Sequence, residues 1–174
     1  HAHFRRDKGY TGMKIGIAGY KGRVGQILVR ELSSGAWKNL ELAAGSEKKA
    51  HTVHTAVENF SVSEDADGLM SECDCAIDFT TPESTLQNIA AAVKNRTAMV
   101  IGTTGIDEAG QKIIAEAAKT IPILFTANMS VGVNLLLALV EQAAAKLGPE
   151  WDIEIFESHH KNKIDAPSGT ALAL

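Results

Sequence analysis

The residues with the clearest chemical potential lie in one segment near the C-terminal end, 157–171, which reads ESHHKNKIDAPSGTA. His159 and His160 supply imidazoles, which exchange protons near neutral pH. Lys161 and Lys163 supply ammonium groups, and a lysine beside other cations is pushed toward deprotonation and becomes a usable acid. The segment therefore predicts proton-transfer chemistry next to a concentration of positive charge.

The end of the same segment has the features of a helix start. Pro167 sets the entry of the chain, and Ser168 is a natural N-cap, so the amide groups of Gly169 and Thr170 would point outward and bind an anion. Such a site suits a small ligand that carries carboxylates. Two other interpretations stay open, a metal site and a functionless basic loop. Adjacent histidines face different ways, however, and no carboxylate spacing completes a metal shell.

A second candidate site is the glycine turn GYKGRVG, which follows a short apolar run and precedes a helical pattern. Gly19, Gly22 and Gly25 would allow a tight turn, a close approach of backbone to a pyrophosphate, and close helix–strand packing. The helix N-terminus would offer amide groups and partial positive charge to the phosphates. The spacing is GxxGxxG, with Lys21 where the usual GxGxxG has its second glycine, so a purely structural turn is the alternative.

An acidic residue is expected after the second strand of a dinucleotide-binding unit, where it would hold the adenosine ribose. Glu47 fits this position and favours NAD, whereas the neighbouring Lys48 could neutralise the extra phosphate of NADP. The alternative is a solvated run of charges on a loop.

Apolar runs alternate with helical patterns along the chain, and these elements must position the candidate residues. The expected strands are 14–19, 40–45, 76–79, 98–101, 121–125 and, with alternating polar and apolar residues, 152–157. The expected helices are 22–32, one beginning at Thr81-Pro82-Glu83, 107–119 and 131–147, with a further helix beginning after Pro167.

This order predicts an α/β fold, with a Rossmann-type parallel sheet covered by helices on both faces. We expect residues 13–128 to form a dinucleotide-binding domain, and 129–174 to begin a second, α+β substrate domain. Residues 1–12 have no periodicity and resemble a tag or an unstructured lead. Ligands bind at the carboxyl ends of the strands in such sheets, so function is expected in the loops that follow them.

Composition narrows the function classes. The 174 residues carry a net charge of -4, which argues against nucleic acid or an anionic membrane as the main partner, and no apolar run is long enough for a membrane span. Cys73 and Cys75 are too close along one extended segment for an easy disulfide, so we expect reduced, inert thiols. Without a secretory signal, the expected compartment is the cytoplasm.

Taken together, the motifs resemble those of the dihydrodipicolinate reductase family, which serves the diaminopimelate route to lysine. The resemblance runs from about Lys14 to Leu174 and is carried by IAGYKGRVG, AIDFTTPE, MVIGTTG, TANMSVGVN and above all ESHHKNKIDAPSGTA. It implies a Rossmann domain that binds NADH or NADPH, a substrate domain that also builds a homotetramer, and reduction of a small cyclic dicarboxylate.

The resemblance also implies residue roles. His159 would donate and accept a proton and Lys163 would donate one, with no metal, while His160, Ser168, Gly169 and Thr170 would hold the substrate. The implied cofactor contacts are Gly19, Tyr20, Lys21, Gly22, Arg23, Val24, Glu47, Lys48, Phe79, Thr80, Gly102, Thr103, Thr104, Thr126, Ala127, Asn128 and Met129.

Two departures from the family pattern matter. Lys21 replaces a glycine that many members carry, and the family's chains continue for roughly a hundred residues past the match, completing the substrate domain. A chain that ended at Leu174 is expected to bind cofactor in part and catalyse poorly. The competing hypothesis is a dinucleotide-binding module without catalysis, either a truncated product or a redox-sensing regulator.

Overall fold

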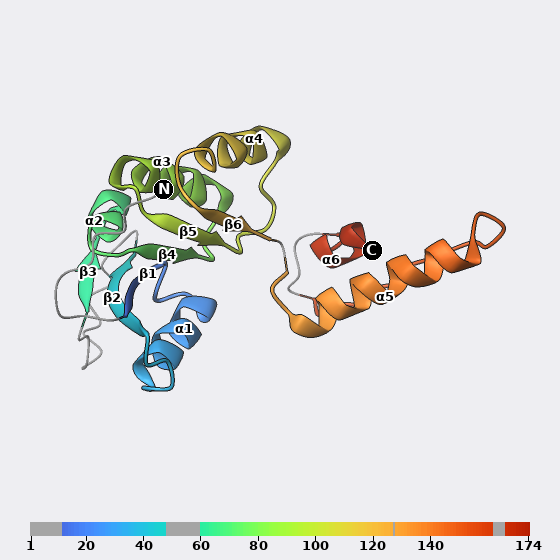
Figure 1. Cartoon of the computed structure of the whole chain (residues 1–174), viewed down its shortest axis with the longest axis horizontal. Helices are drawn as coiled ribbons and strands as arrows, with labels where there is room; N and C mark the ends of the chain where they lie inside the picture. Colours follow the sequence, from blue (N-terminus) through green and yellow to red (C-terminus); the bar gives the residue numbers. More distant parts are fainter. Residues whose placement is uncertain (1–11, 48–59, 127, 162–165) are drawn as a thin grey trace. The chain divides into compact units, whose positions relative to one another are not determined.

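A computed structural model describes residues 12–47, 60–126, 128–161 and 166–174. The chain divides into two compact units, unit 1 (His1–Phe125) and unit 2 (Thr126–Leu174) (Figure 1). Unit 1 contains β1 (Met13–Ala18), α1 (Arg23–Ser33), β2 (Leu40–Ser46), β3 (Ser61–Ser63), α2 (Ala66–Ser71), β4 (Cys75–Asp78), α3 (Pro82–Asn95), β5 (Ala98–Ile101), α4 (Glu108–Ala117) and β6 (Ile123–Phe125). Unit 2 contains α5 (Val131–Leu147) and α6 (Gly169–Ala173).

The strands of unit 1 form a single parallel sheet in the order β3-β2-β1-β4-β5-β6. This confirms the predicted Rossmann-type sheet. The direction of strand succession reverses between β1 and β4, so the loops that follow these two strands diverge and leave a crevice.

Helices cover both faces of the sheet, as expected (Figure 1). On one face, Leu28 and Leu32 of α1 pack against Ile17 and Leu42 of the central strands. On the other face, α2, α3 and α4 lie side by side over a larger apolar cluster that includes Leu69, Ile89 and Ile114. Because both faces are covered, the last four residues of β1 are all buried rather than alternating.

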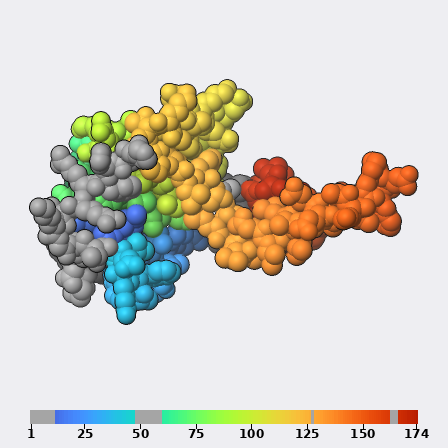
Figure 2. All heavy atoms as spheres, viewed as in Figure 1, coloured from blue at the N-terminus to red at the C-terminus, as the bar shows by residue number. Residues whose placement is uncertain are grey.

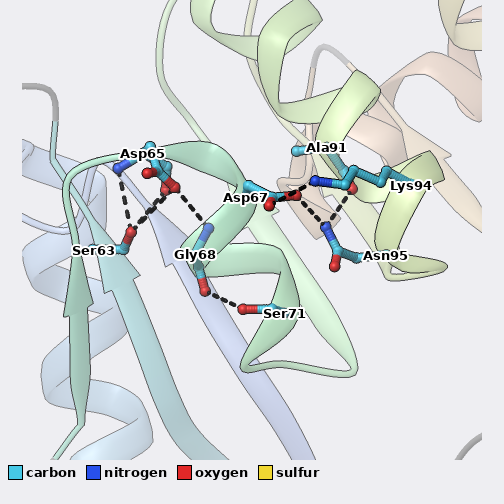
Figure 3. Close-up of polar contacts among 8 residues, drawn as sticks. All are labelled: Ser63, Asp65, Asp67, Gly68, Ser71, Ala91, Lys94 and Asn95. Carbon is cyan, nitrogen blue, oxygen red and sulfur yellow. Dashed lines mark hydrogen bonds and ion pairs between the residues drawn. The ribbon is translucent and has the colours of Figure 1, made fainter.

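Side chains at the helix starts explain where most helices begin. Thr81 accepts a hydrogen bond from the Ser84 amide, with Pro82 in the first turn of α3, as the sequence predicted. Asp65 caps α2 in the same way through the Gly68 amide, at 2.7 Å (Figure 3). Asp67 then ties α2 to α3, because its carboxylate accepts hydrogen bonds from Lys94 and Asn95 (Figure 3).

The two cysteines are free, as predicted, and the structure adds that both are buried. Burial is the main cause that raises the pKa of the Cys73 thiol to about 12 and that of Cys75 to about 11. Both are therefore protonated at neutral pH and lack the thiolate that reactivity requires.

Three differences separate the observed elements from the expected ones. The short β3 and α2 were not predicted, because three strand residues and two helical turns carry too little periodicity to detect. The prediction of a strand at 152–157 is wrong, since these residues form no regular structure. A strand needs a hydrogen-bonded neighbour, and the described residues of unit 2 contain only helices as regular elements.

Within unit 2, α5 has the predicted bounds and buries none of its side chains. The exposed large apolar residues along it are Val131, Leu135, Leu136, Leu139 and Leu147. In the space-filling view, atoms of α5 lie at the surface along the length of the helix (Figure 2, orange). None of the helices in the described ranges is both long and apolar enough to cross a membrane.

Candidate functional site

A cavity of about 440 Å³ opens in unit 1 at the carboxyl ends of β1, β2 and β4, where the strand order reverses. Its volume lies in the range of ordinary small-molecule sites. It is lined by Ala18, Gly19, Gly22, Ser46, Glu47, Glu64, Asp65, Ala66, Phe79, Thr80, Thr81, Ser84, Gln87 and Asn88. Of the predicted cofactor residues, Gly19, Gly22, Glu47, Phe79 and Thr80 therefore share one cavity.

The glycine turn is packed too tightly for side chains at two of its positions. Gly19 has a φ of 67°, and a Cβ atom there would lie 2.8 Å from the Thr80 methyl carbon. A Cβ atom on Gly25 would lie 2.3 Å from the Gly19 carbonyl oxygen. Gly19 thus allows the turn, and Gly25 allows α1 to pack closely behind it.

The start of α1 differs from the other helix starts in the described residues. Five helices begin at a side chain that accepts a backbone amide, namely Asp65, Thr81, Asp107, Ser130 and Ser168. In α1 the capping position is Gly22, which has no side chain to offer. The first amides of α1 therefore meet no capping side chain beside the cavity, which suits an anionic ligand.

Tyr20 and Lys21 occupy the middle of the turn in different ways. The Tyr20 ring is buried, packs edge-on against Phe60 with ring centroids 5.6 Å apart, and does not line the cavity. The Lys21 ammonium lies 5.5 Å from the centre of the Tyr20 ring. The side chain of Lys21, at the usual second-glycine position, thus lies over the Tyr20 ring and does not line the cavity.

Gly102, Thr103 and Thr104, the predicted residues after β5, are not among the residues that line the cavity. Gly102 packs directly against Phe79. A Cβ atom on Gly102 would lie 2.1 Å from the Phe79 ring, so no larger residue fits there without a shift. Thr103 is buried and donates a hydrogen bond to the Asp78 carboxylate at 3.3 Å. Thr104 is exposed, as are Arg23 and Val24 at the start of α1.

Sequence reasoning missed one wall of the cavity. Ser84, Gln87 and Asn88 lie three and four residues apart on α3, so they share one face of that helix. The available signal was this polar stripe, which runs beside the apolar stripe used to identify the helix. Glu64 and Asp65 were also missed, since they precede the undetected α2.

In unit 2, Glu157 joins two parts of the histidine segment. One of its carboxylate oxygens accepts a hydrogen bond from the Ser168 amide at 2.8 Å, and the other lies 3.7 Å from Nδ1 of His159. The Ser168 hydroxyl in turn accepts the Ala171 amide and caps α6, as predicted. The structure thus brings His159 and the start of α6 together around a carboxylate that sequence reasoning did not single out.

Asn128 connects the beginning of unit 2 to the same helix. Its side-chain amide donates to the Thr170 hydroxyl at 3.0 Å, and its carbonyl oxygens accept from Thr126 and Ser130. Met129 and His160 are exposed. Three predicted residues, Lys48, Ala127 and Lys163, lie outside the described residues.

Comparison with known proteins covers both units. Residues 13–129 match the family described as "Dihydrodipicolinate reductase, N-terminus", and residues 132–174 match "Dihydrodipicolinate reductase, C-terminus".

Curated relatives carry the name 4-hydroxy-tetrahydrodipicolinate reductase. The protein from Cupriavidus metallidurans is 45% identical over 169 residues, which is 93% of this chain and 63% of that protein. The protein from Zymomonas mobilis is 43% identical over 164 residues, which is 94% of this chain and 61% of that protein. The chain thus spans a little over three fifths of the length of these relatives.

Solved structures agree with this assignment. A dipicolinate-bound dihydrodipicolinate reductase from Paenisporosarcina sp. TG-14 matches with a TM-score of 0.74 and 27% identity, over 92% of this chain and 63% of that one. A homoserine dehydrogenase from S. aureus, at a TM-score of 0.55 and 13% identity over 66% of this chain and 32% of that one, shares the fold alone. With both of its parts matched in order, the chain belongs to the dihydrodipicolinate reductase family.

Proposed function

We propose that this chain contributes the dinucleotide site and part of the substrate site of a 4-hydroxy-tetrahydrodipicolinate reductase in lysine biosynthesis. The enzyme would use NADH or NADPH to reduce the cyclic dicarboxylate to tetrahydrodipicolinate. The observation that carries the proposal is the identity of 43–45% with curated relatives of that name, extending over both units.

The residues of unit 1 fit a dinucleotide. Gly19 and Gly25 leave no room for side chains at the turn, and the first amides of α1 meet no capping side chain beside a cavity of about 440 Å³. These amides would hold the pyrophosphate, and Glu47 in the cavity lining would accept hydrogen bonds from the ribose. When bound, the nicotinamide supplies the hydride for the reduction.

The substrate's carboxylates would be held in unit 2. Gly169 and Thr170 form the first turn of α6, behind the Ser168 cap, and would offer amide groups and a hydroxyl to one carboxylate. His160 would add an imidazole to this anion site. Asn128, by its hydrogen bond to Thr170, would fix the hydroxyl that faces the ligand.

His159 and Lys163 would handle protons. Reduction at C4 of the conjugated ring imine places negative charge across the conjugated system, and C3 must then take a proton. We assign that transfer to Lys163 and an accompanying proton exchange to His159, whose side chain is 39% exposed and lies beside Glu157. Thr126, Asn128 and Met129 would border the nicotinamide side.

We infer the compartment and the oligomeric state of the whole protein from its family. We expect a cytoplasmic protein and a homotetramer when the protein is full length. The row of exposed apolar side chains on α5 supports a further packing partner for this helix.

The decisive test is a two-step titration. The Kd for NADH is measured from NADH fluorescence as the chain is added. The titration is then repeated in the presence of pyridine-2,6-dicarboxylate, a stable analogue of the substrate. Tightening of NADH binding by the dicarboxylate supports the reductase. Binding of NADH that the dicarboxylate leaves unchanged supports the alternative, a dinucleotide-binding module without catalysis, and absence of binding of both NADH and NADPH overturns the proposal.

A further inference from the structure

A fully buried carboxyl side chain lies at the end of β4, and the next three residues along the chain line the cavity. The side chain of Asp78 is 0% exposed. One of its oxygens accepts hydrogen bonds from the Thr80 amide at 2.9 Å, the Thr80 hydroxyl at 2.6 Å and the Thr103 hydroxyl at 3.3 Å. The other accepts from the Asn88 side chain at 2.9 Å. All of these donors are neutral.

These hydrogen bonds join three separate parts of unit 1. Thr80 belongs to the loop between β4 and α3, Thr103 to the loop after β5, and Asn88 to α3 itself. Thr103 also accepts hydrogen bonds from the Thr80 amide and from the buried Thr85 hydroxyl. Asp78 is therefore the common acceptor that fixes the positions of the two loops relative to each other.

The position of Thr80 matters for the glycine turn. Its methyl carbon lies where a Cβ atom on Gly19 would come within 2.8 Å, so the two residues are in close contact across the crevice. Thr80 and Asn88 both line the cavity, whereas Asp78 does not. Any displacement of Thr80 therefore changes the cavity wall that faces the turn.

Both oxygens of Asp78 act as hydrogen-bond acceptors, which a purely steric role would not need. Hydrogen bonds to an ionised acceptor are shorter and stronger than neutral ones, and a buried carboxylate with several donors holds them in a fixed geometry. An asparagine has the same shape, but it keeps a single oxygen and replaces the other by a donor group that faces Asn88.

We propose that Asp78 is a positioning residue for the dinucleotide, which acts through Thr80 on the gap between the β4–α3 loop and the glycine turn. The inference rests on the proposed function, since it assumes that the cavity takes NADH. It adds a residue that would not touch the ligand and yet would set its affinity.

The test compares Asp78→Asn with two controls in the whole chain. Asp67→Asn makes the same chemical change on an exposed carboxylate that also accepts from an asparagine (Figure 3). Ile114→Val removes one methyl group from the core of α4 and so lowers stability without touching the cavity. We expect Asp78→Asn to raise the Kd for NADH about tenfold in fully folded protein, while both controls keep the wild-type Kd.

A double-mutant cycle separates positioning from general destabilisation. Thr80→Val keeps the shape of the side chain and removes the hydroxyl that donates to Asp78. If Asp78 acts through Thr80, the double variant raises the Kd about as much as either single variant. If Asp78→Asn fails to fold, Thr103→Val takes its place, because it removes another hydroxyl that donates to Asp78 at a residue outside the cavity lining. An unchanged Kd in folded Thr103→Val then overturns the positioning role.

The outcomes are distinguishable. Wild-type chain that binds neither NADH nor NADPH overturns the proposed function and this role with it. Wild-type binding, with an unchanged Kd in folded Asp78→Asn or multiplicative effects in the double variant, overturns the positioning role alone.

Discussion

A carboxylate oxygen of Glu157 accepts the backbone amide of Ser168 at 2.8 Å, across eleven residues of the histidine segment. Ser168 is buried, so this amide has little access to water if its acceptor is lost. The second oxygen of Glu157 lies 3.7 Å from Nδ1 of His159, which makes the carboxylate a link between the imidazole and the start of α6.

We predict that Glu157→Ala destabilises unit 2 more than Glu157→Gln does. The alanine leaves the Ser168 amide without its acceptor, at a cost of about 1–3 kcal/mol, whereas glutamine keeps an oxygen in place. Hydrogen exchange of the Ser168 and Ala171 amides measures the effect, and the exposed Glu154→Gln serves as the control. Equal protection in the alanine and glutamine variants would contradict the assigned role.

The glycine turn yields a second prediction. Gly25→Ala places a Cβ atom 2.3 Å from the Gly19 carbonyl oxygen, so the turn or α1 must shift. Overpacking of this kind costs about 1–3 kcal/mol, and we expect NADH affinity to fall at least tenfold. Fluorescence titration and a thermal melt measure the two effects.

Gly35→Asn is the control for Gly25→Ala. Gly35 has a φ of 76° but no atom within 4 Å of its Cβ position, and asparagine tolerates this conformation. Wild-type NADH affinity in Gly25→Ala would show that close packing of α1 is unnecessary for the site.

Sequence patterns were sufficient for the elements that carry strong periodicity. The Leu-rich run at 131–147 gave α5 its bounds, and Thr81-Pro82 gave the start of α3. Gly19, Gly22 and Glu47, which were expected at the ends of predicted strands, do line the cavity, and their role in cofactor binding stays a prediction.

The polar partners of the site were harder to predict. Asp78, Asn88 and Glu157 owe their roles to contacts made after folding, for example between residues 78 and 103 or 157 and 168. Alternation at 152–157 indicated a strand, but alternation alone does not supply the neighbouring strand that hydrogen bonds require.

The buried thiols predict a loss of stability at alkaline pH. Burial raises the pKa of Cys73 to about 12 and that of Cys75 to about 11, above the ordinary value of 9.0. The folded state therefore binds these protons more tightly than the unfolded state does. This contribution to the free energy of unfolding is complete below about pH 9 and declines as pH rises toward 12.

Urea unfolding between pH 8 and 11 measures this decline. In Cys73→Ala/Cys75→Ala the slope of stability against pH should be shallower than in wild type. At pH 8 we also expect an alkylating reagent to leave both thiols unmodified in the folded chain and to modify both in urea. Rapid alkylation of folded protein would contradict the assignment of inert thiols.

The most exposed prediction concerns Lys163 in a full-length protein. If this lysine donates the proton to C3, Lys163→Ala lowers kcat by about 10²–10⁴-fold, the usual contribution of a positioned acid. The Kd for NADH should stay near the wild-type value, because the dinucleotide cavity of unit 1 is built from residues of other elements. Lys146→Ala, near the end of α5, controls for removal of a positive charge. Turnover within a few-fold of wild type would remove Lys163 from the proton-transfer step, and a large rise in the Kd for NADH would assign it to cofactor binding instead.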